Sequence, residues 1–292
     1  MCRLSRRQML WLGPLLLGTA QVPAVAAQMA ASRRLVCVGG ALTEIIYALG
    51  AGGELVGVDT TSRYPATARQ LPNVGYARAL SAEGVLTLAP TQLIATEDAG
   101  PPAVLRQIGQ AGVPVTVLPS HHRFEGLLDQ VRQVGTLTGR SAAAQQLQQS
   151  LQAEWLQTQT QINQRRSPPQ RVLFILSHSP SQIMVAGNDT AADAMITLAG
   201  AYNAVEGIRG YKPLTPEAVI AARPDVILLT DLGAQALGGP QAVFKLSGLA
   251  QTPAGKARRV VVHEAMFLLG FGPRLPQAVR QLHASLHAAM TV

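Results

Sequence analysis

Two side chains that could act together on a metal ion, Tyr76 and Arg78, stand two residues apart. A phenol ordinarily titrates near ~10, so a tyrosine can bind as a phenolate at neutral pH when a metal ion and a nearby cation stabilise its charge. Arg78 could supply that cation. Tyr76 could equally be an ordinary tyrosine that ends a loop with its hydroxyl in water. On these two residues alone, both interpretations stay open.

The motif content points away from catalysis. The sequence has no GxSxG elbow, no Walker-type phosphate loop, and no GxGxxG between a strand and a helix. CxxC and HExxH patterns are also missing, so a structural zinc site is not expected. Basic residues are scattered rather than aligned with aromatic residues on one face, which disfavours a nucleic-acid partner. We therefore do not expect an enzyme.

The first 27 residues have the pattern of a signal peptide. Basic residues, including Arg6 and Arg7, precede the apolar run Met9–Ala20, and small residues follow at 24–27. That run is too short to span the ~30 Å hydrocarbon core of a membrane, so we expect cleavage near residue 27 and export to the periplasm. The paired arginines resemble a twin-arginine signal. Cleavage would leave Cys37 as the single cysteine, which excludes an intramolecular disulfide.

Beyond this segment, short apolar or β-branched runs alternate with helical patterns, which predicts βαβ units and mainly parallel sheets. The runs of a first series lie at residues 34–38, 55–58, 93–95 and 115–117. Those of a second series lie at residues 171–176, 226–229 and 260–262. The fold class is therefore α/β, with two Rossmann-like lobes predicted at residues 33–140 and 170–292.

A long polar helix is predicted between the lobes, at residues 141–166. Its apolar residues recur on one face at helical spacing, and they are Leu147, Leu151, Trp155 and Ile162. The following Arg-Ser-Pro-Pro run ends the helix. One helix is a stiffer link than a pair of strands, so we expect the lobes to open and close only slightly.

The chain contains an internal repeat. Residues 80–96 align without a gap with residues 214–230, and each copy reads as a capping Ser or Thr, a short helix, a proline and a buried strand. Glu83 and Glu217 fall in the first turns of the two helices, where the helix dipole favours negative charge. This position is a sufficient structural explanation for both. It would also present one equivalent carboxylate on each lobe to a docking partner.

Several motifs resemble the helix-linked class of periplasmic binding proteins, which serve siderophore, cobalamin and haem importers. The opening of the class is similar to GGALTEIIYALG at 39–50 followed by LVGVD at 55–59. The haem-uptake branch is similar to NVGYARALSAEG at 73–84. The similarity extends to AADAM at 191–195 and GFGPR at 270–274 and covers nearly the whole chain after the signal. It implies a protein that binds haem between its lobes and delivers it to the permease and ATPase of an ABC transporter.

The resemblance also implies roles for single residues. In the haem-uptake branch the corresponding tyrosine ligates the haem iron as a phenolate, which makes Tyr76 the expected ligand and Arg78 its support. An anionic oxygen ligand favours ferric iron, which suits a carrier. Glu83 and Glu217 would pair with cations on the permease.

The resemblance suggests further ligand contacts. Some relatives hold a second, stacked haem through a histidine of the second lobe, which makes His178 a candidate ligand because it directly follows the strand predicted at 171–176. A lone histidine in a loop is also often an ordinary polar residue. Arg209, Tyr211 and Lys212 lie in a loop flanked by glycines and could bind the haem propionates or be solvated. Met266, Phe267 and Phe271 could form an apolar wall against the porphyrin or belong to the core.

The main alternative is a cobalamin- or ferric-siderophore-binding protein of the same architecture, because neither ligand would need Tyr76. Mild basicity, with a formal net charge of +8, fits an anionic ligand such as haem but also fits the absence of any specific partner. We expect a monomer, and one or two bound haems remain equally compatible with the sequence.

Overall fold

The computed structural model describes residues 33–164, 168–179, 182–213 and 215–291. The predicted signal peptide lies outside these residues. From Arg33 onward the chain forms one unit, in which we call residues 33–140 the N-terminal half and residues 168–291 the C-terminal half. Within the described residues, no helix has the length and apolar character needed to cross a membrane.

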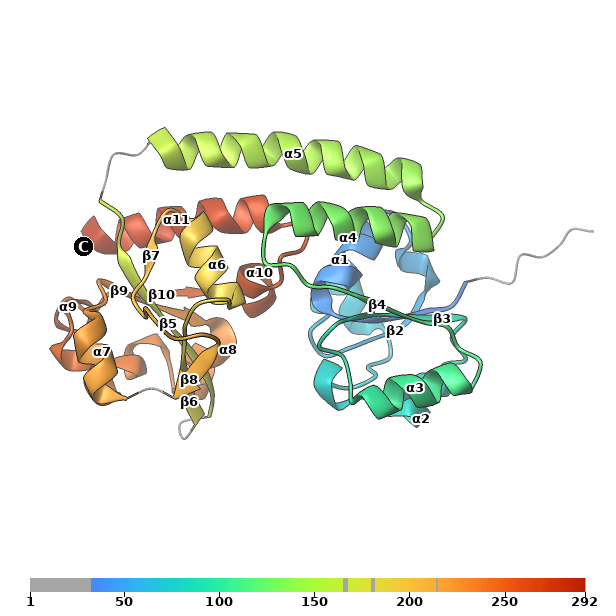
Figure 1. The fold of residues 1–292 in the computed structure, drawn as a ribbon, viewed down its shortest axis with the longest axis horizontal. Coiled ribbons are helices and arrows are strands. Elements are labelled where there is room, and N and C mark those ends of the chain that lie inside the picture. The colour runs from blue at the N-terminus through green and yellow to red at the C-terminus, as the bar shows by residue number, and fades with distance from the viewer. Residues whose placement is uncertain (1–32, 165–167, 180–181, 214, 292) are drawn as a thin grey trace, which may run out of the picture. The chain divides into compact units, whose positions relative to one another are not determined.

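Four parallel strands form the sheet of the N-terminal half, in the order β2-β1-β3-β4 (Figure 1). They are β1 (Leu35–Val38), β2 (Leu55–Val58), β3 (Gln92–Thr96) and β4 (Val115–Leu118). The helices around them are α1 (Gly40–Ala48), α2 (Ala82–Leu86), α3 (Pro102–Gln110) and α4 (Phe124–Leu137). Successive side chains of β1 point to opposite faces, so Cys37 packs with α1 and α4 while Val36 packs with α2 and α3. Because helices cover both faces, every residue of β1 is apolar and buried.

The sheet of the C-terminal half has the order β10-β9-β5-β6-β8, and β7 also pairs with β5. Its strands are β5 (Arg171–Ser179), β6 (Gln182–Ala186), β7 (Tyr202–Asn203), β8 (Tyr211–Pro213), β9 (Val226–Thr230) and β10 (Val260–His263). Strands β5, β7, β9 and β10 are parallel, whereas β6 and β8 run antiparallel to their neighbours. The α/β class is therefore confirmed, with one parallel sheet and one mixed sheet.

The remaining helices lie mostly in the C-terminal half. They are α6 (Ala191–Leu198), α7 (Pro216–Ala222), α8 (Asp231–Ala236), α9 (Pro253–Lys256), α10 (Ala265–Leu269) and α11 (Leu275–Thr291). Short 3-10 helices lie at Gly52–Glu54, Ala66–Gln70, Ala77–Ala79, Pro240–Lys245 and Leu249–Gln251.

The predicted linking helix is α5 (Ser141–Gln164), a single helix of 24 residues. It packs along α4 from the N-terminal half and α11 from the C-terminal half (Figure 1). Its Trp155 is buried and stacks on Phe124 of α4, with ring centroids 4.8 Å apart. The apolar stripe read from the sequence therefore faces the core.

The internal repeat is also present in the structure. Ser81 caps α2 by accepting a hydrogen bond from the backbone N–H of Gly84, and Thr215 caps α7 in the same way through Ala218, each over 3.3 Å. In both copies the capped helix leads into a buried strand, β3 or β9. Leu214, the first residue of the second copy, lies outside the described residues.

Candidate functional site

Polar side chains cluster after the carboxyl ends of the parallel strands, where α/β proteins bind ligands. In the N-terminal half, buried Asp59 follows β2 and accepts hydrogen bonds from the backbone N–H of Gly39 (2.9 Å) and of Thr61 (3.0 Å). Its carboxylate also accepts from the hydroxyl of Ser62 over 2.7 Å. Asp59 therefore fixes the loop after β2 rather than facing a ligand.

Tyr76 lies on the same side of the sheet, directly before the 3-10 helix at 77–79. Gly75 precedes it with φ near +100°, a conformation that favours glycine. The carbonyl of Gly75 accepts from the N–H of Thr60 and its own N–H donates to Asn73, so the backbone before Tyr76 is held at both ends. The Tyr76 side chain is 47% exposed, and its hydroxyl makes no hydrogen bond within the described residues.

Arg78 does not contact Tyr76 through a hydrogen bond. Its Nε donates to Oδ2 of Asp98 over 3.1 Å, and Oδ1 of Asp98 accepts from the hydroxyl of Thr96 over 2.7 Å. Both members of the ion pair are exposed to solvent. The sequence had indicated Arg78 but not Asp98, which follows β3 and becomes a neighbour of Arg78 only in the folded chain.

Tyr211 and Lys212 lie in a strand and not in the predicted loop. Both belong to β8, in which Tyr211 pairs with Ala186 and Lys212 with Val185 of β6. Because side chains alternate along a strand, the two residues point to opposite faces of the sheet, and Lys212 is exposed. This geometry therefore does not favour binding of one propionate by both Tyr211 and Lys212.

The pKa of Tyr211, in the C-terminal half, is affected by the charge of Arg78, in the N-terminal half. Burial raises the pKa of its phenol, while hydrogen bonds from Thr190 and from the backbone of Ala192 and the charge of Arg78 act in the opposite direction. Tyr211 therefore lies within the field of the cation that stands two residues after Tyr76.

Arg209 lies in the segment that connects β7 to β8. It pairs with Asp189, with 2.6 Å between Nε of the arginine and Oδ2 of the aspartate. Both side chains are largely exposed. The cation predicted for a propionate thus already has a carboxylate partner, which the sequence did not indicate.

The three predicted wall residues divide into two groups. Met266 and Phe267 lie on α10 and are partly exposed, and the carboxylate of Glu264 accepts hydrogen bonds from both of their backbone N–H groups. Phe271 is only 6% exposed and belongs to the core, with its ring 5.2 Å from that of His122. Phe271 was expected either in a wall against the porphyrin or in the core, and its burial favours the core.

His178 was expected in a loop after the first strand of the C-terminal half. The strand is longer than predicted, because β5 continues to Ser179 by pairing with β6, and His178 lies inside it. Its side chain lies outside the described part of the structure. Glu83 and Glu217 are exposed in the first turns of α2 and α7, as the repeat indicated.

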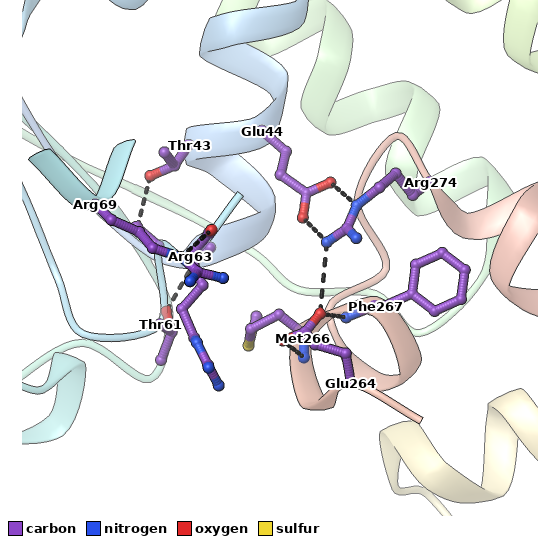
Figure 2. Close-up of polar contacts among 11 residues, drawn as sticks. Thr43, Glu44, Thr61, Arg63, Arg69, Glu264, Met266, Phe267 and Arg274 are labelled. Carbon is purple, nitrogen blue, oxygen red and sulfur yellow. Dashed lines mark hydrogen bonds and ion pairs between the residues drawn. The ribbon is translucent and has the colours of Figure 1, made fainter. Parts of the chain in front are cut away.

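Ion pairs between the halves were not anticipated from the sequence. Arg274 pairs with Glu44 (Figure 2), and Arg63 pairs with Asp231 over 3.6 Å. Within the C-terminal half, Arg274 also pairs with Glu264. The signal that could have found Arg274 was the GFGPR motif, in which the arginine itself was given no role.

The other cavities and clusters of the described residues do not involve the predicted ligand residues. A cavity of about 410 Å³ in the C-terminal half is lined mainly by apolar residues, among them Leu173, Val185, Ile208 and Val219. No group of three or more His, Cys, Asp or Glu side chains that could hold a metal ion is found among the described residues.

Comparison with known proteins gives four informative similarities. A family model described as periplasmic binding protein matches residues 35–265. The solved periplasmic haem-binding protein BhuT, in complex with two haems, is 46% identical over 88% of this chain and 99% of its own, with a TM-score of 0.85. A substrate-binding lipoprotein of an ABC transporter, YvrC of Bacillus subtilis, is 28% identical over 84% of this chain and 77% of its own. The vitamin B12-binding protein of Yersinia pestis is 25% identical over 92% of this chain and 95% of its own.

Proposed function

Because the chain belongs to the periplasmic binding protein family, we propose that it captures ferric haem and delivers it to the permease and ATPase of an ABC importer. The observation that carries this proposal is the 46% identity with BhuT across nearly the whole of that haem-binding protein. The N-terminal 27 residues would direct the chain to the periplasm, where it would act as a monomer. It is a transport receptor and not an enzyme.

Tyr76 is the proposed iron ligand. Its hydroxyl is free of hydrogen bonds within the described residues, and the backbone before it is held by Thr60 and Asn73. A phenolate is an established protein ligand of haem iron and favours the ferric state. An exposed phenol on a fixed loop is well placed to bind iron without first breaking another contact.

Cations around Tyr76 would bind the haem propionates. Arg78 uses its Nε for Asp98, and its two terminal amino groups have no hydrogen-bond partner in the described part of the chain. A guanidinium held in this way can direct two parallel N–H groups toward a carboxylate. Lys212 and Arg209 would be secondary contacts, the latter shared with Asp189.

The wall of the site would include Met266 and Phe267, which are partly exposed on α10. A second haem is also proposed, since BhuT binds two, and His178 is the candidate for its ligand. Glu83 and Glu217 would be the contacts to the permease.

The decisive experiment is a hemin titration of the processed protein, followed by absorbance. We expect a ferric tyrosinate charge-transfer band that saturates at one or two haems per chain. Tyr76→Phe removes only the ligating oxygen and should abolish the band and weaken binding by about tenfold or more. Tyr202→Phe is the matched control, because Tyr202 is also exposed but lies on β7. A Tyr76→Phe protein with the parent spectrum and affinity would refute the ligand assignment.

Cobalamin is the second candidate ligand, favoured by the similarity to the vitamin B12-binding protein. Calorimetric titration with cyanocobalamin distinguishes the two. Tight binding of cyanocobalamin without binding of hemin would replace haem by cobalamin in the proposal.

A further inference from the structure

The side chain of Arg274 joins the two halves of the protein. Its Nε donates to Oε2 of Glu44 over 2.9 Å, and its Nη2 donates to the other oxygen of the same carboxylate (Figure 2). Glu44 belongs to α1 of the N-terminal half, whereas Arg274 immediately precedes α11. Nη2 also lies 3.7 Å from Oε2 of Glu264, at the start of α10. Such two-pronged pairing of arginine with a carboxylate fixes orientation as well as distance.

Aromatic rings from both halves add to this contact. The guanidinium carbon of Arg274 lies 4.1 Å from the ring centroid of Tyr64, in the loop after β2, and 5.1 Å from that of Phe267, on α10. Both distances are within the range of cation–π attraction. One guanidinium therefore contacts two groups from each half, namely Glu44 and Tyr64 from the first and Glu264 and Phe267 from the second. We call these five residues the junction.

The junction is shielded from solvent where the carboxylate pairs. The side chain of Glu44 is 5% exposed and that of Arg274 is 20% exposed. Burial raises the pKa of Glu44, and the hydrogen bond and charge of Arg274 oppose that rise. Burial acts to lower the pKa of Arg274, but Glu44 and Glu264 outweigh it and raise that pKa. The guanidinium therefore stays charged. Separating it from the Glu44 carboxylate would leave a buried charge without a partner, which costs free energy.

Neighbouring contacts attach the same segment of the C-terminal half. Oδ2 of Asp231 pairs with Arg63 from the N-terminal half, while its Oδ1 accepts from the backbone N–H of Ala265 over 2.9 Å. Gly272 lies close against α1, since a Cβ at this position would stand 3.3 Å from Cα of Ala41. Residues 264–274 are thus held to the N-terminal half at several points.

From these contacts we infer that Arg274 is a positioning residue, which holds α10, and with it Met266 and Phe267, in place against the N-terminal half before a ligand arrives. The function of Met266 and Phe267 as a ligand wall rests on the function proposed above. The attachment of α10 does not, because it needs no ligand. The site would then be largely preformed, with one wall carried by residues of the C-terminal half but fixed by α1.

Hydrogen–deuterium exchange of the ligand-free, processed protein tests the attachment. Arg274→Gln removes the charge and the two-pronged pairing. We expect the amides of α10 and of its C-cap, such as those of Leu268 and Gly270, to exchange about tenfold faster. The amides of α3 should be unaffected. Arg132→Gln is the matched control, because Arg132 pairs with Asp129 inside α4 and joins no two elements.

A second variant and a second readout complete the test. Glu44→Gln keeps both rings and Glu264 beside Arg274, so it should fold even if Arg274→Gln does not, and α10 exchange should rise by a smaller factor. Parent-like exchange in the folded variants would overturn the attachment. Hemin affinity should fall severalfold in Arg274→Gln while the tyrosinate band is retained, and faster exchange with unchanged affinity would overturn the positioning role. If the parent binds no hemin, the function proposed above fails while the exchange result still decides the attachment.

Discussion

Arg78 donates a hydrogen bond from its Nε to Oδ2 of Asp98 over 3.1 Å, at the carboxyl edge of the N-terminal sheet. The charge nearest in sequence to Tyr76 is therefore partly neutralised by an acidic residue that is distant in sequence. Removing Arg78 and removing Asp98 should therefore change the electrostatic potential around Tyr76 in opposite directions.

Removing Asp98 and removing Arg78 should shift the haem spectrum in opposite directions. In Asp98→Asn an oxygen acceptor remains but the negative charge is lost, so the tyrosinate band should appear at lower pH. In Arg78→Gln the cation is lost and the band should appear at higher pH. Because both side chains are exposed, solvent screens their charges, and each shift should stay below about one pH unit. An absorbance titration of the hemin-loaded proteins measures this, and shifts of the same sign would contradict it.

The equivalence of Glu83 and Glu217 predicts equal effects on docking. Glu83→Gln and Glu217→Gln should each slow association with the permease–ATPase complex and reduce its dependence on salt, because exposed charges act mainly on the rate of encounter. Hemin binding should be unchanged. Surface plasmon resonance at low and high salt measures these rates. Glu125→Gln is the control, since Glu125 is also an exposed acid in the first turn of a helix, α4, but lies outside the repeat; an equal effect there would contradict a specific role.

Gly40 is expected to tolerate no side chain. A Cβ at this position would lie 2.6 Å from the carbonyl oxygen of Thr61 and 2.9 Å from Cε of Met266. Gly40→Ala should therefore lower the free energy of unfolding by about 1–3 kcal/mol, measured with urea. Gly109→Ala, in α3, is the control: a Cβ there meets nothing within 4 Å. It should leave stability unchanged or raise it, since alanine is the better helix former. Similar losses in both variants would rule out the steric explanation.

His263 should make the protein less stable in mild acid. Burial lowers the pKa of this histidine from its ordinary value of 6.5, and its Nε2 is buried without a hydrogen-bond partner among the described residues. Below pH 6.5 the unfolded chain binds a proton that the folded chain does not, so stability is lost as pH falls until the folded pKa is passed. Urea midpoints at about pH 7.5 and pH 5 should differ less in His263→Gln than in the parent. An identical difference would show that another group is responsible.

Cys37 should be chemically inert in the folded protein. Burial raises the pKa of its thiol to about 12, so the reactive thiolate is scarce near neutrality. Alkylation at about pH 8 should fail on the native protein and go to completion in guanidinium chloride. Rapid labelling of the native protein, followed by mass spectrometry, would show that β1 opens to solvent.

Local patterns sufficed for the elements that are long or repeated. The α5 helix, the two capped helices of the repeat and the buried strands that follow them were predicted because each depends on neighbours in sequence. The strand β8 was missed, since three residues are too few to show a period, and its geometry comes from pairing with β6. The pairing of β5 with β6 extended β5 through His178.

The contacts around the proposed ligand Tyr76 depend on segments that are distant in sequence. The resemblance at GYARAL indicated Tyr76, which is about half exposed in the structure. The partner of Arg78 and the pairing of Glu44 with Arg274 depend on contacts between distant segments, 230 residues apart in the second case. Nothing in the immediate surroundings of either residue in the sequence could have indicated them.

The short strand β8 also affects whether another copy of the chain can add a strand to the C-terminal sheet. It ends the order of the C-terminal sheet, and an unpaired sheet border can recruit a strand from another molecule. Here that border is three residues long, carries the charge of Lys212 and closes with Pro213, which has no N–H to donate. Addition of a strand from another copy of the chain is thereby discouraged at this border.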